Sequence, residues 1–174
     1  RLVSSAASDV YKRQNRDFLI GSEFEKNTGV KIIEDMTLIE IGNKSVMVAH
    51  GDSFCTDDVE YQEMKKEIRS DSWKNTFLAK PIDERIAFAN NMRAESAKRS
   101  SNKPENIMDV NCDYVSQIIS DHNIDYLIHG HTHRPKIHQA GNALRAVLGS
   151  WEEEGWVIEY LSLIHISEPT RHDR

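Results

Sequence analysis

The sequence has few cysteines. Only Cys55 and Cys112 occur among its 174 residues, far apart, and neither belongs to a Cys-x-x-Cys pair or a zinc-finger spacing. Small secreted domains that depend on disulfides carry many more cysteines, whereas proteins of reducing compartments leave their thiols free. The scarcity excludes a disulfide-stapled fold and predicts a cytoplasmic protein.

Long apolar runs are also missing. A helix that crosses a bilayer needs about 20 consecutive, mostly apolar residues, and the longest aliphatic runs here are as short as residues 46–49. We therefore expect no transmembrane segment. A chain of 174 residues with 39% hydrophobic residues is long enough for one domain with its own core and too short for two.

Basic charge is in short supply. Lys and Arg number 22 against 28 Asp and Glu, which gives a formal net charge of -6. An acidic surface repels the phosphates of DNA and RNA. The charge balance therefore argues against a nucleic acid partner.

Both ends of the chain differ from its middle. Codons can be chosen for residues 4–14 and 161–171 so that the end of the first segment is the reverse complement of the start of the second, as in the adaptor of transposase-based sequencing libraries. We therefore expect residues 1–14 and 161–174 to be foreign to the protein, and residues 15–160 to be a piece of a longer reading frame. The alternative is a native polar arm and a native C-terminal strand with its tail.

The middle of the chain has an α/β pattern. Thr37–Ile41 and residues 45–49 are β-branched runs joined by Gly42-Asn43, the kind of turn that closes a hairpin. Residues 125–128 form another strand pattern after a helical one, and residues 144–148 and 156–160 supply two more. We predict a layered α/β domain whose strand-end loops carry the chemistry.

Residues 57–111 differ from these scaffold segments. They show no strand pattern, and their apolar residues recur at helical spacing, which predicts an all-helical insertion. Residues 60–103 contain ten basic and seven acidic side chains, so this part is basic within an acidic chain. Such an element can lie against anionic lipid headgroups, or it can be an ordinary helical hairpin with a solvated face.

Three histidines stand at the ends of predicted strands. His50 follows residues 45–49, and His131 and His133 form a His-x-His after residues 125–128. If the chain turns at Gly130, both imidazoles of this pair can reach adjacent metal ions. Imidazole with carboxylate and amide oxygen suits Mn²⁺, Zn²⁺ or Fe²⁺, and paired ions of this kind occur in many phosphoesterases. Asp52 is the first carboxylate candidate and is better placed to orient His50 than to bridge two ions.

The motifs resemble those of a known family. NRD at residues 15–17, HGD at 50–52 and GHTH at 130–133 match, in order, the later metal motifs of the calcineurin-like metallophosphoesterases. The longer runs NRDFLIG, HGDSFCTDDVEYQ, IMDVN and LIHGHTHRP are similar to the UDP-2,3-diacylglucosamine diphosphatases, a family of lipid A biosynthesis. The resemblance covers residues 15–160, including the helical insertion, which forms a lid in that family.

This resemblance implies a fold and a reaction. The fold is a partial calcineurin-like sandwich, layered αββα, with a helical cap at residues 57–111. The reaction is hydrolysis of the pyrophosphate of UDP-2,3-diacylglucosamine to UMP and 2,3-diacylglucosamine 1-phosphate by hydroxide bound to two Mn²⁺ ions. The cap would hold the enzyme at the cytoplasmic face of the inner membrane, and no obligate protein partner is implied.

The resemblance also implies roles for single residues. Asn15, His50 and His131 are then ligands of one Mn²⁺, and His133 is a ligand of the other. The implied substrate contacts are Asn15, Arg16, Asp58, Ser96, Ser100, Lys103 and His131. Without the resemblance, we would interpret Arg16 and Lys103 as solvated charges. Asp58 would be a residue favoured at a helix N-terminus, and Ser96 a neutral position within a helix.

Two motifs of the family are not found. These are an Asp-x-His and a Gly-Asp that supplies the bridging carboxylate, and Gln14 stands where the family has Gly. We therefore expect this chain to hold most of one metal site, a single ligand of the other, and no activity of its own. Two alternatives remain: a metallophosphoesterase acting on a soluble nucleotide or phosphodiester, and a lipid- or nucleotide-binding fragment without catalysis.

Overall fold

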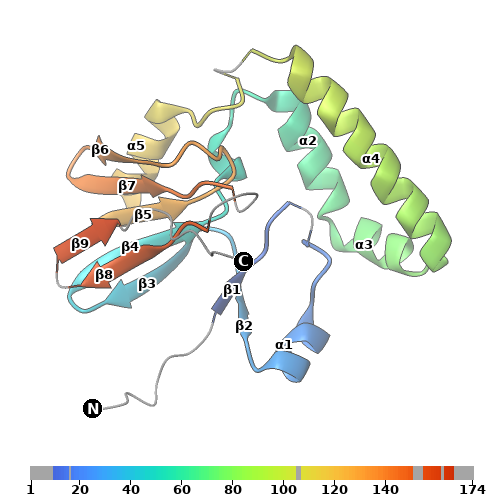
Figure 1. Cartoon of the computed structure of the whole chain (residues 1–174), viewed down its shortest axis with the longest axis horizontal. Helices are drawn as coiled ribbons and strands as arrows, with labels where there is room; N and C mark the ends of the chain where they lie inside the picture. Colours follow the sequence, from blue (N-terminus) through green and yellow to red (C-terminus); the bar gives the residue numbers. More distant parts are fainter. Residues whose placement is uncertain (1–9, 16, 105–106, 151–154, 162, 167–174) are drawn as a thin grey trace. The chain divides into compact units, whose positions relative to one another are not determined.

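The computed structural model describes residues 10–15, 17–104, 107–150, 155–161 and 163–166. The chain divides into two compact units, one formed by Arg1–Asp52 with Cys112–Arg174 and the other by Ser53–Asn111. The first unit combines strands and helices, and the described part of the second is helical (Figure 1). The predicted α/β class is confirmed.

A sheet of five strands lies at the centre of the first unit, in the order β3-β4-β5-β7-β6. Strands β4, β5 and β7 are parallel, whereas β3 and β6 are antiparallel to their neighbours. The hairpin between β3 and β4 turns at Gly42, whose φ of 62° is readily adopted by glycine. The bounds are β3 Thr37–Ile41, β4 Lys44–Ala49, β5 Tyr126–His129, β6 Lys136–Ala140 and β7 Ala143–Val147.

The core of this unit lies between the sheet and helix α5 (Cys112–His122). Met47 of β4 and Leu127 of β5 are neighbours in the sheet, and both are fully buried. The helix buries Val115, Ile118 and Ile119 and approaches the sheet at β6. These three residues recur at helical spacing, which is how an amphipathic helix covers a sheet.

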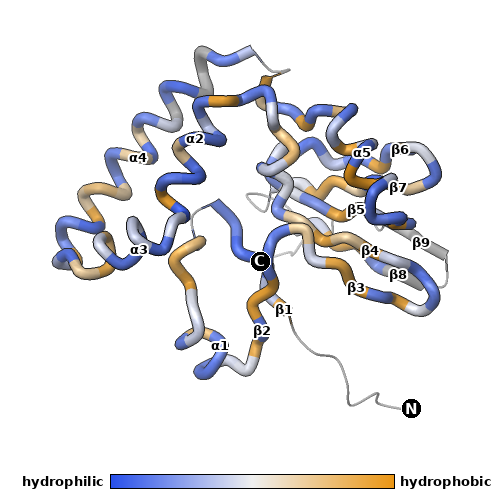
Figure 2. The backbone as a smooth tube through the Cα atoms, turned by 180° about the vertical axis from the view of Figure 1, so that it is seen from behind, coloured by the Kyte–Doolittle hydropathy of each residue, from blue (hydrophilic) through white to orange (hydrophobic). Residues whose placement is uncertain are grey.

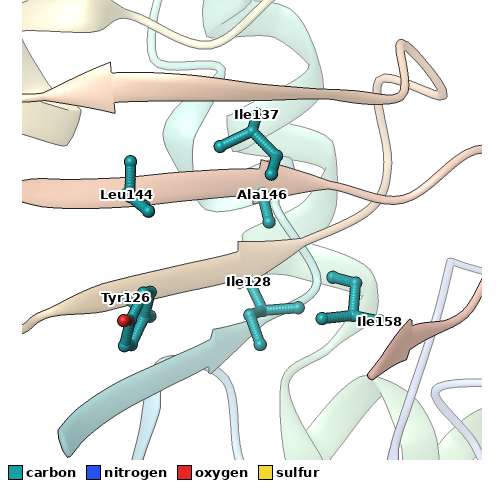
Figure 3. A pocket seen from close by; sticks show the side chains of 6 residues that line it. All are labelled: Tyr126, Ile128, Ile137, Leu144, Ala146 and Ile158. Atoms are coloured by element: carbon teal, nitrogen blue, oxygen red, sulfur yellow. The ribbon is translucent and has the colours of Figure 1, made fainter. Parts of the chain in front are cut away.

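Side chains that alternate with this core line a small apolar pocket. Because successive strand residues point to opposite faces, Tyr126 and Ile128 point away from Leu127. Figure 3 shows them beside residues of β6 and β7, with one residue of β8 at the rim. The pocket is lined by Tyr126, Ile128, Ile137, Leu144, Ala146 and Ile158.

Short elements complete the first unit. Strand β1 (Val10–Lys12) is parallel to β2 (Lys31–Ile33), and β8 (Ile158–Leu161) is antiparallel to β9 (Leu163–Ile166). Helix α1 (Ser22–Thr28) ends at Gly29. Strands β1 and β9 fall within the two ends expected to be foreign, and the foreign origin of those ends stays a prediction.

The described residues of the second unit form helices α2 (Val59–Ile68), α3 (Asp71–Leu78) and α4 (Ile82–Asn102), which follow a short 3₁₀ turn at Asp52–Phe54. Ser70 caps α3 by accepting the backbone N–H of Trp73. Trp73 stacks on Phe77 with ring centroids 4.6 Å apart, and Phe88 of α4 packs against both rings. This aromatic cluster joins α3 to α4.

The hydropathy of the chain follows this division. Figure 2 shows apolar colour along the central strands of the first unit, and alternating polar and apolar stretches along the helices of the second. Across the described residues, none of the helices combines the length and apolar character needed to cross a membrane.

Candidate metal centre

The loop that follows β4 carries His50, Gly51 and Asp52. His50 and Asp52 are buried, and the backbone N–H of His50 donates to the Asp35 carboxylate over 2.8 Å. Gly51 has a φ of 112°, and a Cβ at this position would lie 2.7 Å from Nδ1 of His129. The packing against His129 therefore explains why the centre of this motif is glycine.

The loop that follows β5 carries Gly130 to His133 and lies beside the first loop. Strands β4 and β5 are parallel and pair Ala49 with His129, so the two loops leave the same edge of the sheet. The N–H of Gly130 donates to the carbonyl oxygen of His50 over 3.0 Å. The topology thus joins, through the backbone, the two motifs that the sequence places 80 residues apart.

Two histidines of the second loop have an uncommon backbone conformation. The φ angles of His131 and His133 are 66° and 52°, in the left-handed region that side chains with a Cβ rarely adopt. The N–H of Thr132 donates back to the carbonyl oxygen of Gly130 over 2.8 Å, which makes the turn tight. Strained conformations of this kind persist where surrounding contacts hold them, and they concentrate at functional sites.

Three predicted metal ligands converge at these loops. The rings of His50 and His131 meet edge to face with centroids 5.0 Å apart and an interplanar angle of 74°. The side-chain amide of Asn15 donates to Nδ1 of His131 over 3.1 Å. His50, His131 and Asn15 come from three separate segments of the chain, so the fold gathers them.

Asp17 organises the segment that presents Asn15. Its carboxylate accepts hydrogen bonds from the backbone N–H of Gln14 and from the hydroxyl of Tyr11. The hydrogen bond to Asp17, together with burial and the negative charge, raises the pKa of Tyr11 to about 12. The NRD motif therefore contains one candidate ligand and one residue that shapes the loop.

Other predicted site residues lie elsewhere. His133 is exposed, on the turn after His131. Ser96 is exposed on α4, in the second unit. Arg16 and the side chain of Ser100 fall outside the described residues.

Asp58 and Lys103 contact each other in the second unit. The Lys103 ammonium donates to Oδ1 of Asp58 over 2.5 Å and lies 3.4 Å from a carboxylate oxygen of Glu60. The hydrogen bond to Asp58 is the main reason that the pKa of Lys103 is raised above its usual value. Asp58 also caps α2 by accepting the N–H of Tyr61, as expected for an acidic residue at a helix N-terminus.

Sequence reasoning missed two buried polar residues beside the loops. His129 is 1% exposed, Arg145 of β7 is 8% exposed, and the Arg145 guanidinium lies 3.1 Å from Nε2 of His129. His129 was visible as the first histidine of the HGHTH run, but nothing in the sequence places Arg145 near it. The contact depends on the pairing of β5 with β7.

The converging donors fit part of the coordination shell of one transition metal ion. Two imidazoles and an amide are ligands that Mn²⁺, Zn²⁺ and Fe²⁺ accept. Within the described ranges, no three or more His, Cys, Asp or Glu side chains gather in an arrangement that could hold a metal ion. The described residues therefore supply histidine and amide donors for a single ion and no cluster with a bridging carboxylate.

Comparison with known proteins agrees with the motifs. The pattern of the calcineurin-like phosphoesterase family matches residues 8–135, which is more than half of the chain. The chain therefore belongs to the calcineurin-like phosphoesterase family, as the sequence resemblance predicted. Membership of this family implies dependence on a divalent metal.

Individual relatives share one name. The UDP-2,3-diacylglucosamine hydrolase of Pectobacterium carotovorum subsp. carotovorum is 39% identical over 83% of this chain and 62% of its own length. The proteins of that name from Enterobacter sp. strain 638 and Haemophilus influenzae are 38% and 35% identical over 92% and 91% of this chain, and over 69% and 65% of their own lengths. This chain thus spans roughly two thirds of the length of the curated relatives it matches.

Proposed function

We propose that the whole protein hydrolyses the pyrophosphate of UDP-2,3-diacylglucosamine, releasing UMP and 2,3-diacylglucosamine 1-phosphate for lipid A biosynthesis. The observation that carries this proposal is the similarity, at 35% to 39% identity over most of the chain, to proteins named UDP-2,3-diacylglucosamine hydrolase. The matched relatives span the helical unit as well as the histidine loops. The proposed substrate therefore rests on similarity along the whole matched segment and not on the histidine loops alone.

Two Mn²⁺ ions are the proposed cofactor. Asn15, His50 and His131 would hold one ion and His133 the other. The chemistry such ions supply is polarisation of phosphoryl oxygens and a lower pKa for a coordinated water. Support comes from the edge-to-face contact of His50 with His131 and the hydrogen bond from Asn15.

The proposed substrate contacts combine charge and hydrogen bonding. Arg16 and Lys103 would neutralise the diphosphate, and Asn15, His131, Asp58, Ser96 and Ser100 would supply polar contacts. Asp58 and Glu60 hold the Lys103 ammonium in one place, so a cation is fixed before substrate arrives. A preorganised cation stabilises developing charge at smaller entropic cost than a free lysine does.

The helical segment at residues 57–111 is proposed as a cap over the acyl chains that attaches the enzyme to the cytoplasmic face of the inner membrane. Its exposed side chains include Val59, Leu78, Ile82 and Ile86. Residues 60–103 add a basic excess that would favour anionic headgroups. No protein partner is required by this proposal.

The test is a comparison of substrates with the purified whole protein. UDP-2,3-diacylglucosamine, UDP-glucosamine and a water-soluble phosphodiester would each be incubated with Mn²⁺ and, as a control, with excess chelator. We expect rapid, chelator-sensitive release of UMP from the acylated substrate alone. Cleavage of only the soluble compounds would favour a different metallophosphoesterase, and binding without cleavage would favour a non-catalytic lipid- or nucleotide-binding protein.

A further inference from the structure

A buried pair of polar side chains lies beneath the two histidine loops. His129 ends β5, Arg145 lies on the neighbouring strand β7, and their side chains approach to 3.1 Å at Nε2 of the imidazole. Both residues are at least nine-tenths buried. Burial of a guanidinium is costly unless hydrogen bonds compensate it, so this contact is a specific feature of the sheet.

The partners of the imidazole determine its tautomer. A guanidinium only donates hydrogen bonds, so Nε2 of His129 accepts from Arg145. The other nitrogen, Nδ1, lies 2.9 Å from the carbonyl oxygen of Gly130, which only accepts. Both contacts are satisfied when the ring is neutral and its proton is on Nδ1. The ring then links Arg145 to the backbone at Gly130.

That backbone connects directly to the candidate ligands. The Gly130 carbonyl belongs to the peptide bond that leads into His131, whose φ is 66°. The Gly130 N–H donates to the His50 carbonyl, and Gly51 leaves room for the His129 ring where a Cβ would stand 2.7 Å away. The ring of His129 therefore contacts both loops.

We propose that Arg145 is a positioning residue: through His129 it holds the Gly130 peptide, and thereby keeps His131 in its left-handed conformation facing His50. This positioning role of Arg145 goes beyond the proposed function. Only the expected change in Mn²⁺ affinity rests on the proposed function. Partners behind the ligands of a metal site orient those ligands, and their loss typically lowers metal affinity or activity by about 10- to 100-fold.

The test compares the 174-residue chain with Arg145→Met, which keeps bulk and removes the donors, and Arg145→Lys, which keeps a donor. Arg93→Met, an exposed arginine of α4, is the control for loss of charge. Nitrogen-detected NMR without metal reports the His129 tautomer, and nuclear Overhauser contacts report whether the rings of His50 and His131 remain together. Titration with Mn²⁺ gives the affinity.

We expect Arg145→Met to lose both the Nδ1–H tautomer and the contact between the rings, and to bind Mn²⁺ at least about tenfold more weakly. Arg145→Lys should restore the tautomer, and Arg93→Met should behave as the parent chain. An unchanged ring contact in Arg145→Met would overturn the proposal, even if the tautomer changed. If Arg145→Met does not fold, His129→Phe, which removes the same link, should lose the ring contact, and retention there would overturn the proposal as well.

The NMR readouts separate this proposal from the proposed function. If the parent chain binds no Mn²⁺, the metal assignment fails for this chain. The ring contact in the metal-free variants still decides the role of Arg145.

Discussion

The two units of the chain place their polar groups differently. Within the described residues, every buried polar or charged residue belongs to the first unit, namely His50, Asp52, His129 and Arg145. Among the large apolar side chains of the second unit, Val59, Leu78, Ile82, Ile86 and Phe88 are exposed, whereas Phe54, Phe77 and Val110 are buried. Its described charged residues are exposed or half-buried. The first unit therefore depends on buried hydrogen bonds near one sheet edge, and the second on helix caps and one aromatic cluster.

This difference indicates where single substitutions act. A buried polar group that loses its partner costs more than a surface charge that loses one. Substitutions at the histidine loops should therefore affect stability as well as metal binding and turnover. Substitutions in the helical unit should affect stability, except where they touch the substrate.

The largest expected effect is loss of turnover in His131→Ala of the whole protein. Removing this imidazole removes a proposed metal ligand, and metal ions contribute several kcal/mol to charge stabilisation in the transition state, so we expect turnover to fall by about 1000-fold or more. Release of UMP and binding of the lipid product would be measured together. His122→Ala, an exposed histidine of α5, is the matched control. Undiminished turnover in His131→Ala would contradict the metal assignment.

The second largest effect is expected in the aromatic cluster of the helical unit. Phe77 is 8% exposed and contacts Trp73 and Phe88. Phe77→Ala should lower the free energy of unfolding by about 3 kcal/mol through lost burial and a cavity. Phe88→Ala, at a residue that is 38% exposed, should cost clearly less. Urea unfolding of both variants measures the difference, and equal costs would show that the cluster is not the core of this unit.

Gly51→Ala tests the contact between the two histidine loops. The added Cβ would stand 2.7 Å from Nδ1 of His129 and 2.9 Å from the Gly130 oxygen, at a φ of 112°. We expect a cost of about 2 kcal/mol in the free energy of unfolding. Gly29→Ala is the control because its φ is also positive, at 76°, but nothing lies within 4 Å of the new Cβ. A Gly29→Ala cost as large as that of Gly51→Ala would mean that backbone conformation alone explains the effect.

The smallest effect is expected at the Asp58–Lys103 pair. Asp58→Ala removes the cap of α2 and should cost about 1 kcal/mol. The raised pKa of Lys103 means that this pair stabilises the fold below the usual lysine pKa of 10.5, and that this stabilisation is lost as pH rises through the folded value. Unfolding measured from neutral to alkaline pH should therefore show a smaller alkaline loss in Asp58→Ala than in the parent chain. Parallel curves would show that the ion pair contributes nothing to stability.

Much of the sheet was predictable because four of its strands are short, mostly apolar runs and its hairpin has a strong turn signal. Strands β3, β4, β5 and β7 were predicted within one residue at each end. Strand β6 was missed because three of its five residues, Lys136, His138 and Gln139, are polar, and its pairing with β7 decides its conformation. Helix α1 was missed because its seven residues are too few to show a helical period.

The parts of the candidate site that lie in short sequence motifs were predictable. His50 and His131 stand directly after strands, and parallel strands bring such ends together. The role of Arg145 depends on which strands pair and in which register, which no local pattern of this sequence specifies. Buried links between distant strands are therefore the part of the site that required the structure.

Isotope labelling is the most direct test of the proposed metal-dependent hydrolysis of UDP-2,3-diacylglucosamine, in which we propose that hydroxide attacks the α-phosphorus, the one bonded to uridine. The whole protein would hydrolyse this substrate with Mn²⁺ in water enriched in oxygen-18, and both products would be analysed by mass spectrometry. Attack at the α-phosphorus places the label in UMP, and we expect none in 2,3-diacylglucosamine 1-phosphate. Label in the lipid phosphate, or no cleavage of the acylated substrate at all, would contradict this proposal.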